Sequence, residues 1–145
     1  MQVAFYVHDP DKRIVGWEAK LGKGQRVPGT LMGGARPDVL PHDLVQYVVE
    51  AATHYEHGFW GLVAKGATFR STGRRRTTPG REVIARHRPE LQASEHLANV
   101  AAWRVGTRTS VTDALDSVAR QWAVLSIGER LVFEWPSTAG VIEHA

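Results

Sequence analysis

Strand-like alternation at both ends of the chain is the sequence feature that most restricts the fold. Residues 2–8 alternate between apolar and polar side chains, and residues 13–21 form a second strand-like segment after a turn at residues 9–12. Residues 129–135 alternate in the same way. Because an isolated two-stranded hairpin is only marginally stable, we expect the C-terminal strand to join the N-terminal hairpin in one antiparallel sheet.

Between these ends, apolar residues recur at helical spacing and predict about four helices. Residues 22–40 are rich in glycine and proline and predict a loop. The sequence therefore predicts an α+β fold, in which a small antiparallel sheet, made of the N-terminal hairpin and the C-terminal strand, packs against the helices. The expected helical segments are 41–57, stopped by Gly58; a short one over 59–64; one that begins at the N-cap Thr78, is kinked or restarted by Pro89 and runs to Gly106; and one that begins with a capping box over 110–113 and ends at Gly128.

The length and composition of the chain exclude several classes of protein. With 145 residues, the chain is expected to form a single globular domain over residues 1–145. The absence of cysteine excludes disulfide scaffolds, cysteine nucleophiles and thiolate metal sites. No apolar run is long enough for a membrane span, and residues 1–6 lack the pattern of a signal peptide. We therefore expect a cytoplasmic protein with no membrane partner.

The strongest charge signal lies in residues 70–88, which hold seven arginines and a single acid, Glu82, whereas the rest of the chain is net negative. Guanidinium groups, hydroxyls and unpaired N–H groups at a helix N-terminus are the donors from which phosphate oxygens accept hydrogen bonds. An alternative is that the arginines pack on an acidic face, such as that of the segment 42–50. We expect an exposed anion-binding patch made of Arg70, Arg74, Arg75, Arg76 and Arg81.

A row of polar side chains follows the predicted helix at every fourth position. Histidine and glutamate in such a row can transfer protons or bind a metal. The row is His42, Gln46, Glu50 and His54, and the candidate catalytic residues are His42, Asp43 and Glu50. The alternative is that this row is the solvent-exposed side of an amphipathic helix, whose buried side carries Leu44, Val45, Val48 and Val49.

His54 and His57 form a second pair, at i, i+3, and are candidate metal ligands. A metal site needs three or four ligands that are held by supporting hydrogen bonds, and only Glu50 and Glu56 lie nearby in the sequence. We therefore expect no bound transition metal and no other cofactor.

The segment Leu-Pro-His-Asp-Leu-Val-Gln-Tyr-Val-Val-Glu occupies residues 40–50 and is followed by Gly-Phe-Trp-Gly at 58–61 and Gly-Ala-Thr-Phe at 66–69. It resembles a family of small bacterial proteins of uncharacterised function, whose shared segment reads Leu-Pro-His-Asp-Leu-Val, often a second histidine, then an aromatic residue and Val-Val-Glu. The resemblance implies no particular activity. Where that family often has the second histidine, this chain has Gln46, and glutamine is a poor ligand for transition metals.

Two functional hypotheses follow from these patterns. The favoured hypothesis is a small cytosolic binding protein that uses the arginine-rich loop to hold an anionic partner, either nucleic acid or an acidic protein. The alternative is a small enzyme or metal-binding protein that acts on an anionic substrate. It would be built on the polar face of the helix over residues 41–57, with His42, Glu50, His54 and His57. Sequence motifs for a phosphate-binding loop, a dinucleotide site and a serine nucleophile are absent.

Overall fold

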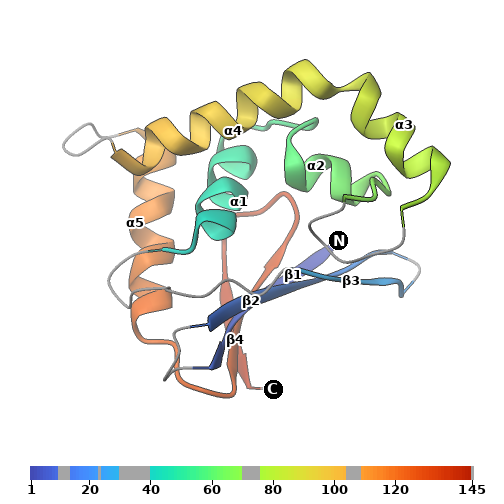
Figure 1. The fold of residues 1–145 in the computed structure, drawn as a ribbon. Helices are drawn as coiled ribbons and strands as arrows, with labels where there is room; N and C mark the ends of the chain where they lie inside the picture. Colours follow the sequence, from blue (N-terminus) through green and yellow to red (C-terminus); the bar gives the residue numbers. More distant parts are fainter. Residues whose placement is uncertain (10–13, 23, 30–39, 70–75, 104–108, 145) are drawn as a thin grey trace.

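The computed structural model describes residues 1–9, 14–22, 24–29, 40–69, 76–103 and 109–144, and for residues 100–103 it describes the backbone alone (Figure 1). These residues form one antiparallel sheet and a set of helices, which confirms the predicted α+β fold. The elements are β1 (Gln2–Asp9), β2 (Ile14–Lys20), β3 (Arg26–Pro28), α1 (His42–Ala52), α2 (Phe59–Ala64), α3 (Thr78–Arg86), α4 (Arg88–Trp103), α5 (Ser110–Ala123), β4 (Glu129–Glu134) and β5 (Val141–His144).

The sheet joins the two ends of the chain, as the alternating pattern predicts. Its strand order is β3-β2-β1-β4-β5, so β1 lies between its hairpin partner β2 and the C-terminal strand β4. Phe5 pairs with Trp17 on one side and with Leu131 on the other. The two outer strands, β3 and β5, were not predicted. They have only three and four residues, which is too short to show an alternating pattern, and β3 lies in the segment that we expected to be a loop.

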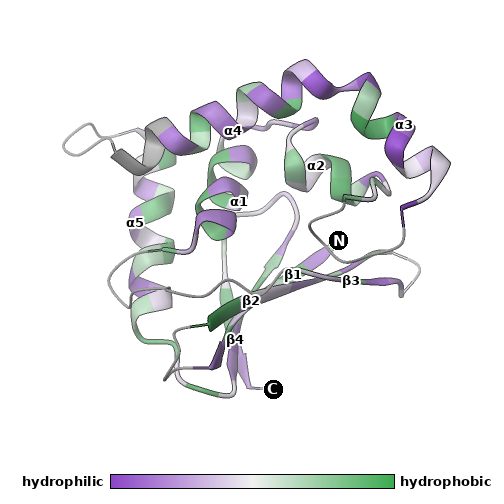
Figure 2. Cartoon of the chain, viewed as in Figure 1, coloured by the Kyte–Doolittle hydropathy of each residue, from purple (hydrophilic) through white to green (hydrophobic). Residues whose placement is uncertain are grey.

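Helix α1 lies at the centre of the molecule. It is surrounded by the sheet, α2, α4 and α5, and α4 crosses above it on the side away from the sheet (Figure 1). Figure 2 shows hydrophobic residues along α2 and many hydrophilic residues along α3 and α4, which form the outer layer. An aromatic cluster fills the space between α1, α2 and the sheet, and its fully or almost fully buried members are Phe5, Trp17, Tyr47, Trp60 and Phe133.

The position of α1 corrects the expectation of an amphipathic helix with one solvent-exposed side. All of residues 44–51 are buried, including the polar side chains of Gln46 and Glu50. The predicted apolar side is therefore buried as expected, but the opposite side is covered as well. The pattern of polar residues identified a shared face, whereas α2 and α4 determine that this face is not exposed to solvent.

α1 also ends earlier than predicted, at Ala52 rather than at residue 57. His54 adopts a left-handed backbone conformation, with φ of 55°. The N–H of His54 donates to the carbonyl of Ala51, and the N–H of Tyr55 donates to the carbonyl of Glu50. These two hydrogen bonds form the Schellman motif that closes many helices, here with histidine in the position that glycine usually takes. Gly58 therefore does not stop α1.

Smaller corrections concern the ends of the other helices. The predicted break at Pro89 is present, because α3 ends at Arg86 and α4 begins at Arg88. The N-cap of α3 is Thr77 rather than Thr78, since the Thr77 hydroxyl accepts the N–H of Gly80 at 3.0 Å. In α5 the capping box begins one residue earlier than predicted, with Thr109 as N-cap and Thr112 as its partner, and the helix ends at Ala123 instead of Gly128.

Substituting Val48 by Asp tests the central position of α1. Val48 has no exposed surface, so the new carboxylate would be buried without a partner. We expect Val48→Asp to lower the free energy of unfolding by about 3 kcal/mol or more, measured by chemical denaturation. The control Ser117→Asp, at an exposed position of α5, should change it by no more than about 0.5 kcal/mol. Equal stability of both variants would contradict the burial of α1.

Candidate functional site

The carboxyl group of Glu50 is buried and receives hydrogen bonds from four donors. Its Oε2 accepts the N–H of Phe59 at 2.8 Å and the hydroxyl of Ser94 at 2.8 Å. Its Oε1 accepts the N–H of Trp60 at 2.9 Å and the N–H of Gly61 at 3.4 Å. The three N–H groups belong to the first turn of α2, where they have no partner within the helix. Glu50 therefore caps α2 from the neighbouring helix α1.

This arrangement gives Glu50 a structural role. Both carboxyl oxygens are already bonded, and the side chain has no exposed surface from which it could reach a substrate. Burial raises the pKa of Glu50 from 4.5 to about 7, while the hydrogen bonds from Ser94 and from the backbone of α2 limit the increase. The positive end of the α2 dipole also favours the ionised carboxylate, as these hydrogen bonds do.

Gly58 provides the space that the Glu50 carboxyl group occupies. Gly58 is the N-cap residue of α2, and a Cβ atom at this position would overlap the carboxyl carbon and both oxygens of Glu50. The glycine is thus needed for a close approach of α1 to the start of α2, and not for the end of α1 as the sequence analysis supposed.

The remaining members of the predicted polar row are separated from one another. His42 lies at the start of α1 and is half exposed; its ring contacts Asp43 at 3.6 Å and Asn99 at 3.4 Å, and the hydrogen bond with Asp43 raises the pKa of His42. The second carboxylate oxygen of Asp43 accepts the indole N–H of Trp17 at 3.0 Å. The Nε2 of Gln46 is buried without a hydrogen-bond partner among the described residues. The row therefore does not form a single site.

His57 belongs to a different cluster from the one that the sequence suggested. Its Nδ1 contacts a carboxylate oxygen of Glu90, whose other oxygen lies 3.4 Å from Nδ1 of His87. The rings of His57 and His87 are stacked, with centroids 3.8 Å apart and planes within 6° of parallel. His54, the expected partner of His57, is exposed and lines a separate cleft. Within the cluster of His57, His87 and Glu90, only His57 was a candidate from the sequence, because the other two residues lie 30 or more residues further along the chain.

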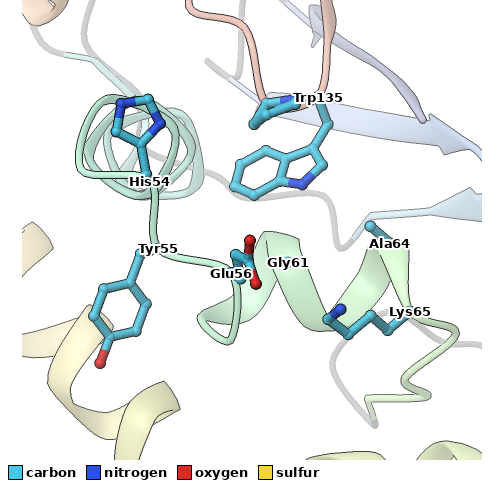
Figure 3. A pocket seen from close by; sticks show the side chains of 8 residues that line it. His54, Tyr55, Glu56, Gly61, Ala64, Lys65 and Trp135 are labelled. Carbon is cyan, nitrogen blue, oxygen red and sulfur yellow. The ribbon is translucent and has the colours of Figure 1, made fainter.

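The cleft next to His54 opens between the α1–α2 loop, α2 and the turn after β4. It has a volume of about 350 Å³ and is lined in part by Glu56, Lys65 and Trp135. Figure 3 shows the indole of Trp135 facing α2 across this opening, with Glu56 and Lys65 on the side of α2. Among the described residues, no side-chain hydrogen bond or ion pair joins two of the residues that line the cleft.

The arginine patch is only partly described. Arg70, Arg74 and Arg75 lie outside the described residues, whereas Arg76 and Arg81 are exposed at the start of α3. Arg86 and Arg88 are also exposed, at the other end of α3. Within the described part of the chain, none of these four arginines forms an ion pair. They do not cover Glu50, which is enclosed by α2 and by Ser94 of α4.

Comparisons with known proteins give no further assignment. A scan against protein-family models finds no match to this chain, and searches of curated proteins and of solved structures find none either. The resemblance of residues 40–69 to a family of small bacterial proteins therefore stays a prediction. Among the described elements, no helix combines the length and hydrophobicity that crossing a membrane requires.

The buried carboxyl group predicts a specific pH dependence of stability. The pKa of Glu50 in the folded chain, about 7, lies above its ordinary value of 4.5, so folding favours the protonated form. This contribution to the free energy of unfolding is complete below about pH 4.5. It falls by at most about 1.4 kcal/mol per pH unit as the pH rises toward about 7, and it is lost above that pH. Glu50→Gln cannot titrate and should lack this contribution.

Thermal unfolding of the parent and of Glu50→Gln, followed from about pH 5 to about pH 8.5, measures this contribution directly. The stability difference between parent and variant should decrease as the pH rises from about 5 and should level off above about 7, where the carboxyl group is ionised in the folded chain as well. Gln92→Ala, at an exposed position of α4, removes no titratable group, so it serves as the control and should show a constant difference. A constant difference for Glu50→Gln as well would show that this carboxyl group does not titrate in the range.

Proposed function

We propose that the protein binds nucleic acid through the arginines of residues 70–88. The observation that carries this proposal is that Arg76, Arg81, Arg86 and Arg88 are exposed and form no ion pair in the described part of the chain. An arginine without an acidic partner inside the protein keeps its guanidinium donors available for phosphate oxygens. α3 lies at the periphery of the molecule, which leaves these groups accessible to a large partner (Figure 1).

The chemistry of the segment favours contacts with phosphates over contacts with bases. Residues 70–88 contain no Phe, Tyr or Trp on which a base could stack. Binding would therefore depend on charge, tolerate many sequences and weaken steeply with salt, because each phosphate contact releases a condensed counterion. An acidic protein surface would offer charge without the regular phosphate spacing, and the experiment below separates these two partners.

The alternative of an enzyme built on the polar row of α1 finds less support. Glu50, its central residue, is enclosed and already holds the start of α2. His42 and His54 lie at opposite ends of α1, and His54 is in the turn that closes it. A proton-transfer site needs its acid and base within hydrogen-bond reach of one substrate, which this arrangement does not provide.

Binding of labelled single-stranded RNA and duplex DNA, followed by fluorescence anisotropy at increasing salt, tests the proposal. We expect the triple variant Arg81→Ser, Arg86→Ser, Arg88→Ser to bind more weakly and to show a shallower salt dependence. The logarithmic slope should decrease by about 0.7–0.9 for each phosphate that the variant no longer neutralises. The control removes an equal charge from other exposed positions, by Lys20→Ser, Arg26→Ser and Arg120→Ser, and should keep the parental slope.

Two results would overturn the proposal. One is that the parent has no affinity for either nucleic acid at low salt. The other is that both triple variants lose affinity equally. Binding of an acidic polypeptide such as polyglutamate, without binding of nucleic acid, would instead identify an acidic protein as the partner. Both triple variants should keep the parental melting temperature, because the substituted side chains are exposed.

A further inference from the structure

Three segments of the chain bring His57, His87 and Glu90 together. His57 lies in the loop between α1 and α2, His87 is the residue between α3 and α4, and Glu90 lies in the first turn of α4. One ligand atom from each residue lies within 4.8 Å of the ligand atoms of the other two. The three residues are partly buried, so that solvent reaches them from one side.

We propose that His57, His87 and Glu90 bind a single Zn²⁺ ion. Two imidazoles and one carboxylate are a common set of protein ligands for zinc when the fourth position is left to water or to a substrate. A carboxylate that contacts both rings already brings the negative charge that a divalent cation requires. This site goes beyond the proposed nucleic-acid binding because it uses none of the arginines, although His87 lies between Arg86 and Arg88 in the sequence.

Zinc binding requires a local rearrangement that the surrounding structure permits. Tetrahedral bonds of about 2.0–2.1 Å place ligand atoms about 3.3 Å apart. Any two ligand atoms of the cluster that lie further apart than this, within the limit of 4.8 Å, must therefore move closer together. The lone pair of each imidazole lies in the ring plane, so the two stacked rings must also tilt toward the ion. Neither His57 nor His87 lies within a helix, and rotation of these two side chains therefore leaves the helices in place.

The expectation that no metal is bound rested on ligands within residues 42–57 alone. In that segment His54 and His57 do not converge, since His54 turns away at the end of α1. The missing ligands come from the α3–α4 junction. His87 lies at the break before Pro89, and Glu90 follows three residues later in the first turn of α4. The cluster therefore meets the requirement for three ligands that the pair His54 and His57 did not.

Titration of the chelator-treated chain with zinc chloride in a calorimeter tests this site. We expect one ion per chain and a higher melting temperature in the presence of zinc, because the ion binds the folded chain and joins three segments. Mg²⁺, which prefers oxygen ligands, should produce neither effect. His57→Ala, His87→Ala and Glu90→Gln should each weaken zinc binding by at least about tenfold.

The controls His8→Ala and His96→Ala remove exposed histidines outside the cluster and should keep the parental affinity. Circular dichroism verifies that each variant is folded. If an alanine variant does not fold, Glu90→Gln still tests the site, because it conserves the size of the side chain. In nuclear magnetic resonance spectra of the parent, zinc should shift the imidazole signals of His57 and His87 and leave those of His8 and His96 unchanged. Absence of saturable binding, or binding that the three variants leave unaffected, would overturn the proposal.

Discussion

The hydrogen bonds of the Glu50 carboxyl group connect three helices, α1, α2 and α4. Glu50 belongs to α1, its backbone donors belong to α2, and the hydroxyl of Ser94 belongs to α4. A six-residue helix such as α2 has little stability of its own, because most of its N–H and carbonyl groups lie in end turns. The cap supplied by Glu50 compensates for this, and it determines the path of the α1–α2 loop. That loop carries His57 toward Glu90 on α4.

A second set of polar contacts attaches α1 to the sheet. Trp17 of β2 donates its indole N–H to the Asp43 side chain, and Trp60 of α2 donates its own to the Asp43 carbonyl. One turn further along the helix, the Tyr47 hydroxyl donates to the carbonyl of Ser137 in the segment after β4. Large aromatic side chains therefore fill the core and also satisfy polar groups at its edges. Asp43, a catalytic candidate in the sequence analysis, thereby orients two tryptophans.

Much of the fold was predictable because alternation and helical spacing are local properties of the sequence. The pairing of β1 with β4 followed from two alternating segments and the instability of a lone hairpin. The role of Glu50 was not predictable in the same way, since its backbone donors lie nine to eleven residues further along the chain and Ser94 lies 44 residues further. Helical spacing shows which side chains share a face, but other elements decide whether water or protein covers that face. The cluster around Glu90 depends on a loop and a helix break, and neither leaves a periodic pattern.

The close approach of Gly58 to Glu50 links the evolution of these two positions. A relative that keeps the glutamate must also keep the glycine, because any side chain at position 58 would displace the carboxyl group from the start of α2. A relative with a short side chain at position 50 loses the cap and, with it, the requirement for glycine. Position 58 should therefore change only in relatives that have also changed position 50.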